Sequence, residues 1–195
     1  MFLETLCIEN NVVKNQEAHW QRIQKTAAHF GFRPPKTPDI LRKMPTNLAS
    51  TKTKCSIIYK EEINKITFTP YIPKRVNSLK LVEAPHICYR FKYADRDMLN
   101  QLRSLKSEYS EVLITQNGCI TDTTYSNVAC KRGDTYFTPD TYLLNGTKRQ
   151  WLIQQGILHE VRITKENLHS YDAVILINAM LDLEDGIVIP TKNIY

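Results

Sequence analysis

The sequence of 195 residues lacks the features that mark several large protein classes. No apolar run approaches the ~18–20 residues that a membrane-spanning helix needs. Six glycines are too few and too dispersed for a dinucleotide-binding loop or a P-loop, and no G-x-S-x-G elbow is present. The five histidines are scattered without an H-E-x-x-H motif, so we expect no dedicated metal site. The lack of a long apolar run likewise leads us to expect no membrane partner.

Cysteine is scarce and irregularly placed. The five cysteines are an odd number and contain no C-x-x-C pair, so we expect reduced thiols in a cytoplasmic protein. Glu4 and Glu9 interrupt the N-terminal stretch where a signal peptide would need an apolar segment, so secretion is not expected. The cysteines are Cys7, Cys55, Cys88, Cys119 and Cys130.

Positive charge is concentrated in the first part of the chain. The net charge is +6, and residues 1–75 carry 13 basic against 6 acidic side chains, whereas residues 76–195 carry 13 against 14. This distribution indicates either an anionic partner or a solvated basic surface. No run of five basic residues exists, so a basic RNA-binding module is the weakest alternative and we expect no nucleic-acid partner.

Residues 15–32 give the clearest helix pattern. Asn15 is a candidate N-cap and Gly31 ends the run. His19 and Arg22 are three residues apart and therefore point to a common side. Apolar residues at helical spacing predict the buried face, and they are Ala18, Trp20, Ile23, Ala27 and Phe30.

The remaining patterns predict an α+β protein with two lobes. In the small lobe, residues 1–75, we expect strands over 2–8 and 12–13, a short helix from Thr37-Pro38 to Met44, and a hairpin over 54–60 and 65–71. The larger lobe, residues 76–195, should contain a helix over 95–106, with Met98, Leu99, Leu102 and Leu105 inward. The other predicted elements are strands 112–115, 119–121, 127–130, 136–137, 173–178 and 187–189 and helices 147–155 and 164–168.

Two segments contain possible anion-binding groups. Gly146 stands at a strand-to-helix junction, where the amides of Thr147 and Lys148 and the helix dipole would form an anion site. Arg22 could bind a phosphate through two N–H groups. Each also has a plain structural explanation, as a loop-to-helix junction and as a surface arginine beside a histidine at the edge of the core.

Two further residues have possible roles in covalent chemistry. Asp122 follows an apolar strand and could stay ionised against a protonated ring nitrogen, or it could simply close a turn. Lys92 lies among aromatic residues and close to Arg90, which would lower the pKa of its amine and make it a nucleophile. Alternatively, its stem packs on the rings while its ammonium reaches water.

Taken together and in this order, the segments resemble the class IV aminotransferases, the pyridoxal-phosphate enzymes of fold type IV. The resemblance covers nearly the whole chain. Its motifs are F-L-E-T at residues 2–5, H-W-Q-R at 19–22, F-K-Y-A-D-R at 91–96, T-D-T-T-Y-S-N at 121–127, T-P at 138–139, L-N-G-T-K-R at 144–149, I-N-A at 177–179 and V-I-P at 188–190. The stretch around Lys92 is most similar to the 4-amino-4-deoxychorismate lyase branch.

The resemblance implies a role for each matched residue. Lys92 would be the Schiff-base lysine, and Arg22 with the amides of Thr147 and Lys148 would bind the phosphate of pyridoxal 5'-phosphate. Asp122 would face the pyridine nitrogen, whose protonation makes the ring an electron sink. The other implied cofactor-binding residues are Asn127, Gly146, Asn178 and Ala179.

The implied function is conversion, through an aldimine, of a small anionic amino-acid-like or amino-deoxychorismate-type substrate. The resemblance implies a two-lobed fold, with a small sheet-plus-helices lobe and a larger barrel-like β lobe, and a homodimer. The sequence departs from the family at Asp122, where glutamate is usual, and at both ends, where a strand and loop of some 25 residues and a helix are missing. These departures leave a degenerate pyridoxal-phosphate-binding protein as the alternative.

Overall fold

The computed structural model describes residues 1–185 and 187–195, which divide into two compact units. Unit 1 contains Met1–Pro73 and Phe91–Asp95, and unit 2 contains Lys74–Arg90 and Arg96–Tyr195. The first division lies close to the predicted boundary after residue 75. The segment around Lys92 differs from the prediction, because it packs with unit 1 although it follows the first 17 residues of unit 2.

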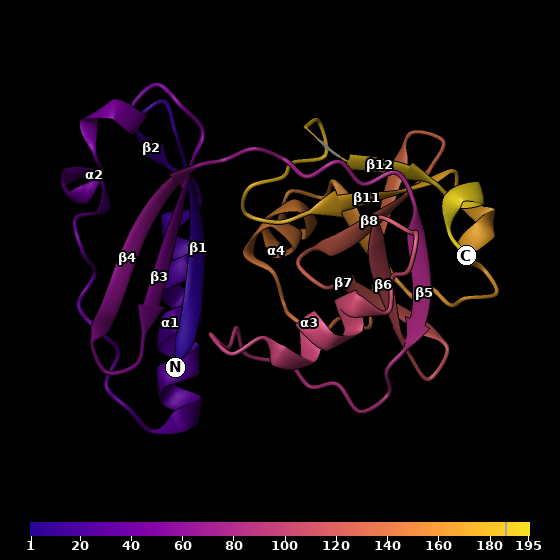
Figure 1. Cartoon of the computed structure of the whole chain (residues 1–195), viewed down its shortest axis with the longest axis horizontal. Helices are drawn as coiled ribbons and strands as arrows, with labels where there is room; N and C mark the ends of the chain where they lie inside the picture. Colours follow the sequence, from indigo (N-terminus) through magenta and orange to yellow (C-terminus); the bar gives the residue numbers. More distant parts are fainter. Residues whose placement is uncertain (186) are drawn as a thin grey trace. The chain divides into compact units, whose positions relative to one another are not determined.

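Unit 1 is a four-stranded antiparallel sheet covered by a helix. The strand order is β2-β1-β3-β4, with bounds Val12–Val13, Phe2–Glu9, Thr53–Tyr59 and Ile63–Pro70. Alternate residues of β3 are buried, which places one face of the strand in the core. Helix α1, Gln16–Phe30, lies along the sheet (Figure 1), and its Ile23 packs with Phe2 and Leu6 of β1. Helix α2 is Ile40–Lys43, followed by a 3-10 helix, Thr46–Leu48.

Unit 2 contains two sheets (Figure 1). The five-stranded sheet has the order β10-β9-β8-β11-β12, with bounds Leu158–Val161, Thr135–Pro139, Asn127–Arg132, Ala173–Ile177 and Ile187–Pro190. The three-stranded sheet joins β5, Leu79–Glu83, to β6, Glu111–Gln116, and β7, Cys119–Thr123. Helices α3, Asp97–Ser104, and α4, Thr147–Gln154, and 3-10 helices Leu168–Ser170 and Thr191–Asn193 complete the unit.

The turn between β6 and β7 shows how local sequence sets this topology. Asn117 and Gly118 both have positive φ, 50° and 75°, the backbone conformation of a tight hairpin turn that asparagine and glycine tolerate best. The turn brings β7 back along β6, so that Asp122 falls near the end of a strand whose five residues are all buried. The position of Asp122 therefore follows from a turn signal visible in the sequence.

The observed helices differ from the predicted ones at several points. Helix α1 begins after Asn15, but that residue is left-handed and its side chain makes no cap hydrogen bond. The N-cap of α2 is Asp39 and not Thr37, because the Asp39 carboxylate accepts from the Arg42 amide at 3.1 Å. Only turns and the short 3-10 helix Leu168–Ser170 form where a helix over 164–168 was predicted, and strand β10 was missed.

Two predicted buried faces are also wrong in part. On α1, His19 and Thr26 are buried with Ile23 and Ala27, whereas Phe30 is 44% exposed. On α3, Leu99 is the buried residue, while Met98 and Leu105 are exposed by half or more. Among the described residues no helix combines the length and the apolar composition of a membrane span.

Candidate active site

Unit 1 contains a buried cluster of polar residues between β1 and α1. Both oxygens of Glu4 accept from Arg22: Nε donates to Oε1 at 2.8 Å and Nη2 to Oε2 at 2.6 Å. His19 Nδ1 contacts Oε2 at 2.7 Å. Because His19 and Arg22 lie one helical turn apart, both reach the same carboxylate on the neighbouring strand. The prediction that they share a side of the helix is thereby confirmed.

The partners of Glu4 decide its charge. Burial alone raises the pKa of this carboxyl, but the charge and hydrogen bonds of Arg22, with the bond from His19, lower the pKa to about 2. Burial is also the main factor for His19 and lowers the pKa of its imidazole. The hydrogen bond and charge of Glu4 oppose this, and the charges of Arg22 and Lys92 lower the pKa further. Glu4 is therefore ionised and His19 neutral at pH 7, with its Nδ1–H donating to the carboxylate.

The segment carrying Lys92 is attached to the edge of β1. The amide of Leu3 donates to the Lys92 carbonyl at 2.8 Å, and Phe2 forms an isolated antiparallel bridge with Tyr93. The rings on both sides of Lys92 pack into an aromatic cluster: Tyr93 lies 5.6 Å from Phe2, and Phe91 lies 4.9 Å from Phe30, between ring centroids. Lys92 is half-buried, and its backbone is fixed by these flanking contacts.

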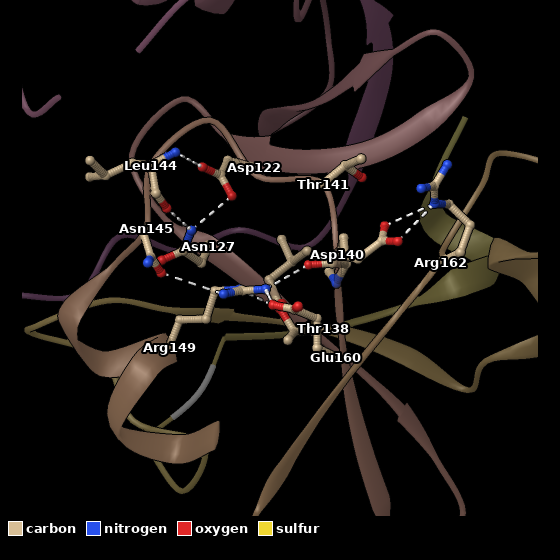
Figure 2. Close-up of polar contacts among 12 residues, drawn as sticks. Asp122, Asn127, Thr138, Asp140, Thr141, Leu144, Asn145, Arg149, Glu160 and Arg162 are labelled. Carbon is tan, nitrogen blue, oxygen red and sulfur yellow. Dashed lines mark hydrogen bonds and ion pairs between the residues drawn. The ribbon is translucent and has the colours of Figure 1, made fainter. Parts of the chain in front are cut away.

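Unit 2 contains a second buried carboxylate, Asp122, near the end of β7 (Figure 2). Its Oδ2 accepts from the amides of Leu143 at 3.1 Å and Leu144 at 2.9 Å. Its Oδ1 accepts from Asn127 Nδ2 at 2.8 Å, and the same nitrogen donates to the Leu144 carbonyl at 2.8 Å. Asp122 and Asn127 therefore hold both the N–H and the C=O of Leu144.

Asp122 has room for one further donor. A carboxylate has about four acceptor positions, and three N–H groups of the described residues occupy three of them. Burial raises the pKa of Asp122 to about 6, against the opposing effect of the bonds from Leu144 and Asn127 and the charge of Arg149. The group is mainly ionised at pH 7, and a protonated ring nitrogen would fit it in charge and in hydrogen bonding.

Gly146 and the start of α4 lie next to this network. A Cβ built on Gly146 would stand 1.9 Å from Asn127 Oδ1, so no larger residue fits without displacing that side chain. Helix α4 begins at the buried Thr147, and the amides at a helix N-terminus, together with the helix dipole, favour an anion there. Lys148 contributes only its backbone here, because its ammonium pairs with Asp182 and lies 5.0 Å from the centre of the Trp151 ring.

Arg149 is buried and joins α4 to the five-stranded sheet (Figure 2). Its guanidinium donates to the Thr138 hydroxyl at 3.2 Å and to the Pro139 carbonyl at 2.8 Å, and it forms an ion pair with Glu160. It also lies 4.4 Å from the centre of the Tyr142 ring. These contacts fix the orientation of the first turn of α4.

Asn178 and Ala179 form the turn after β11. Asn178 Nδ2 donates to the Tyr125 carbonyl at 3.4 Å, which connects this turn to the loop between Asp122 and Asn127. Asn178 Oδ1 accepts from the Met180 amide at 2.8 Å, so the side chain also closes its own turn. Within residues 1–185 and 187–195, no group of three His, Cys, Asp or Glu side chains could hold a metal ion.

The family model described as amino-transferase class IV matches residues 1–183. The chain therefore belongs to this family, and the predicted resemblance to the pyridoxal-phosphate enzymes of fold type IV is confirmed, including the α+β fold, the enzyme class and the cofactor.

Particular relatives are similar over most of the chain. A protein of Haemophilus influenzae is 33% identical over 180 residues, which are 91% of this chain and 96% of its own. A crystal structure named as a 4-amino-4-deoxychorismate lyase from Haemophilus somnus is 31% identical with a TM-score of 0.81, covering 93% of this chain and 97% of that one. A structure named as a hypothetical aminotransferase from Mycobacterium tuberculosis in its pyridoxal-phosphate-bound form shares the fold at 15% identity with a TM-score of 0.78, covering 96% of this chain and 79% of that one.

The predicted site residues fall into two groups in the structure. Arg22 and Lys92 lie in unit 1, and the other seven lie in unit 2 around the Asp122 loop and the turn after β11. Sequence reasoning gave no role to Glu4 and Arg149, although both stand in matched motifs. For Glu4 the signal was a charged residue in a largely apolar strand, which indicates a buried ion pair, whereas Arg149 stands among polar residues and had no such signal.

Proposed function

We propose that the protein acts on 4-amino-4-deoxychorismate or a closely similar amino acid and releases pyruvate. The proposal is supported by the 31% identity over 97% of a structure named as such a lyase, and by the name of a Schizosaccharomyces pombe relative, an aminodeoxychorismate lyase 26% identical over 195 residues. Transamination of an amino acid to a keto acid is the second candidate, supported by the family itself.

The observation that carries the site assignment is the arrangement around Asp122. A buried carboxylate with one acceptor position left is hydrogen-bonded to the loop that leads through Gly146 into α4. This pairing suits a ligand that carries both a basic ring nitrogen and a phosphate. Pyridoxal 5'-phosphate is such a ligand. When bound, it withdraws electrons from the substrate and so makes removal of the α-proton feasible.

We assign the following roles to the residues of this chain. Lys92 Nζ would hold the cofactor covalently, and after the substrate amine displaces it the free amine would accept the α-proton of the substrate. Asp122 accepts a hydrogen bond from the ring N–H, while the amides of Thr147 and Lys148 bind the phosphate. Arg22 adds a guanidinium to the phosphate while Glu4 fixes its orientation. The supporting positions are Asn127, Gly146, Asn178 and Ala179.

Reduction with borohydride tests the role of Lys92. We expect the purified protein to be yellow, and treatment with borohydride to attach the cofactor irreversibly to Lys92, as mapped by peptide mass spectrometry. The matched control is Lys80, a lysine of unit 2 whose ammonium donates to the Leu105 carbonyl at 3.0 Å: Lys80→Gln should not change the adduct. An adduct on any lysine other than Lys92 contradicts the assignment.

A coupled pyruvate assay separates the two candidate reactions. Lyase activity releases pyruvate from amino-deoxychorismate without a keto-acid acceptor, whereas transamination requires the acceptor. A protein that binds the cofactor but turns over neither type of substrate would be a degenerate binder.

We further propose a cytoplasmic homodimer. Five cysteines, none of them in a disulfide, suit a reducing compartment. Large apolar side chains of unit 2 are exposed by half or more, among them Met98, Leu105 and Val188, and a second copy would cover part of such a surface. Light scattering of the purified protein should give about twice 22.7 kDa, and a monomer mass contradicts this proposal.

A further inference from the structure

The backbone before α4 is held by a side chain from a different strand. Leu143 and Leu144 both donate their amides to Asp122 Oδ2, and Asn127 connects Oδ1 to the Leu144 carbonyl (Figure 2). Thr147, the first residue of α4, follows only three positions after Leu144. A displacement of Leu144 would therefore be transmitted to the first amides of the helix through two residues.

We propose that Asp122 is a positioning residue for the phosphate site, in addition to its contact with the cofactor ring. By fixing residues 143 and 144, its carboxylate aims the amides of Thr147 and Lys148 at the place where the phosphate binds. This inference rests on the proposed function, since the phosphate is that of the cofactor.

Three features of the network support this role. Asp122 and Asn127 are 5% and 6% exposed, and hydrogen bonds in such a buried environment of low dielectric are stronger than in water. Asn127 Oδ1 lies against the backbone of Gly146, so the amide of Asn127 has little freedom to turn over. Arg149 fixes α4 on its other side through Thr138 and Pro139.

The aspartate in place of the usual glutamate is consistent with two tasks. A glutamate carboxylate would lie one C–C bond, about 1.5 Å, farther from β7. The shorter side chain keeps its oxygens within 3.1 Å of two loop amides and within 2.8 Å of Asn127 Nδ2. The departure from the family at this position thus coincides with a side chain whose bonds are mostly made to the protein.

Asp122→Asn separates the two tasks. An asparagine at this position can accept from the loop amides with its oxygen, but its NH₂ group would then face the NH₂ group of Asn127, and two donors repel. If it turns over, it loses the bonds from Leu143 and Leu144. Either arrangement loosens the loop while keeping the volume of the side chain.

The test compares two ligands on the cofactor-free protein. Binding of pyridoxal 5'-phosphate and of pyridoxal, which lacks the phosphate, is followed by absorbance and calorimetry. For Asp122→Asn we expect the ratio of the two affinities to fall about tenfold or more, because the phosphate amides are misplaced. Hydrogen exchange of the Leu143 and Leu144 amides, followed by NMR without any ligand, should become about tenfold faster or more, because each amide loses either its buried acceptor or the negative charge on that acceptor.

The matched control is Asp140→Asn. Asp140 is also an aspartate of unit 2, but its carboxylate pairs with the exposed Arg162 at 2.9 Å, and we expect neither the ligand ratio nor the two exchange rates to change. Should Asp122→Asn fail to fold, Asn127→Ser removes the donor to the Leu144 carbonyl and is expected to shift the same two measurements in the same direction.

An unchanged affinity ratio, or unchanged exchange at Leu143 and Leu144, would overturn the inference. Asp122 would then act on the cofactor ring alone, and both ligands would lose affinity equally. Absence of pyridoxal 5'-phosphate binding by the wild-type protein would instead overturn the proposed function, so the two failures are distinguishable.

Discussion

Each of the two units buries a carboxylate, and the surroundings of the two groups differ in kind. In unit 1 Glu4 is paired with the guanidinium of Arg22, whereas in unit 2 Asp122 accepts from two backbone amides and one side-chain amide. The pKa of Glu4 falls to about 2 and that of Asp122 rises to about 6. With burial similar, a guanidinium hydrogen-bonded to the carboxylate outweighs desolvation at Glu4, whereas the amide N–H groups and the charge of Arg149 do not outweigh it at Asp122.

The largest expected effect comes from removing the Glu4 carboxylate. Glu4→Ala removes the carboxylate that compensates the largely buried charge of Arg22 and accepts three hydrogen bonds, two from Arg22 and one from His19, so we expect a loss of about 3–5 kcal/mol in the free energy of unfolding. Urea denaturation followed by circular dichroism measures this loss.

The control for Glu4→Ala is Glu9→Ala on the same strand. Glu9 forms an exposed ion pair with Lys14 at 3.7 Å, and its removal should change the free energy by no more than about 0.5 kcal/mol. Equal losses for the two variants would mean that the Glu4 cluster contributes no more than a surface pair.

The pH dependence of stability should have opposite signs for the two carboxylates. The ordinary pKa of Glu4 is 4.5 and its pKa in the folded protein is about 2, so as the pH falls the unfolded chain takes up the proton before the folded protein does. About 3 kcal/mol of stability is therefore lost as the pH falls from about 4.5 to about 2. The ordinary pKa of Asp122 is 3.8 and its pKa in the folded protein is about 6, so here the folded protein takes up the proton at a higher pH than the unfolded chain does. The free energy of unfolding should therefore rise by about 3 kcal/mol as the pH falls from about 6 to about 4.

Carbon NMR titration of the two carboxyl groups, with urea denaturation at several pH values, measures both effects. Asp122→Asn should abolish the gain between about pH 6 and 4 and leave the loss below about pH 4.5 in place. The two pKa values should shift in opposite directions. A pKa of 4.5 or above for Glu4, or of 3.8 or below for Asp122, would contradict this difference between the two units.

A smaller effect is expected at Gly146. Gly146→Ala places a methyl group 1.9 Å from Asn127 Oδ1, and we expect a loss of about 1–3 kcal/mol in unfolding free energy because Asn127 must move away from Asp122. Combining it with Asn127→Ala should recover part of this loss, a coupling that a double-mutant cycle measures by calorimetry.

Gly133→Ala serves as the control for backbone strain. Gly133 has a φ of +56°, and a methyl group added there would have no atom within 4 Å, so its cost of about 1 kcal/mol comes from conformation alone and should not couple to Asn127. Equal coupling of both glycine variants would show that contact with Asn127 is not the cause.

Much of the fold was predictable because local signals and packing agree. The alternating pattern of β3, the tight turn at Asn117-Gly118 and the helix that ends at Gly31 are each specified by a few neighbouring residues. Where tertiary contacts decide, the predictions failed: His19 is buried because Glu4 is its partner, and β10 pairs in parallel with β9, across the intervening helix α4.

The site residues were predictable through motifs, but their partners were not. The spacing of His19 and Arg22 indicated a shared side of the helix, yet the carboxylate that both contact lies 15 and 18 residues earlier in the chain. In the same way, the sequence indicated Asp122 as a possible turn residue or ring partner, and the amides it accepts from lie 21 and 22 residues later. Such pairings depend on the folded topology.

The attachment of Phe91–Asp95 to unit 1 has a consequence for denaturation. The segment of the proposed nucleophile, Phe91–Asp95, belongs by its packing to a different compact unit from the residues on either side of that segment. Partial melting that detaches the Phe91 and Tyr93 rings from Phe30 and Phe2 would release the amine while the carboxylate and helix of unit 2 remain folded. Loss of the yellow colour on mild heating would then report the opening of unit 1 before global unfolding.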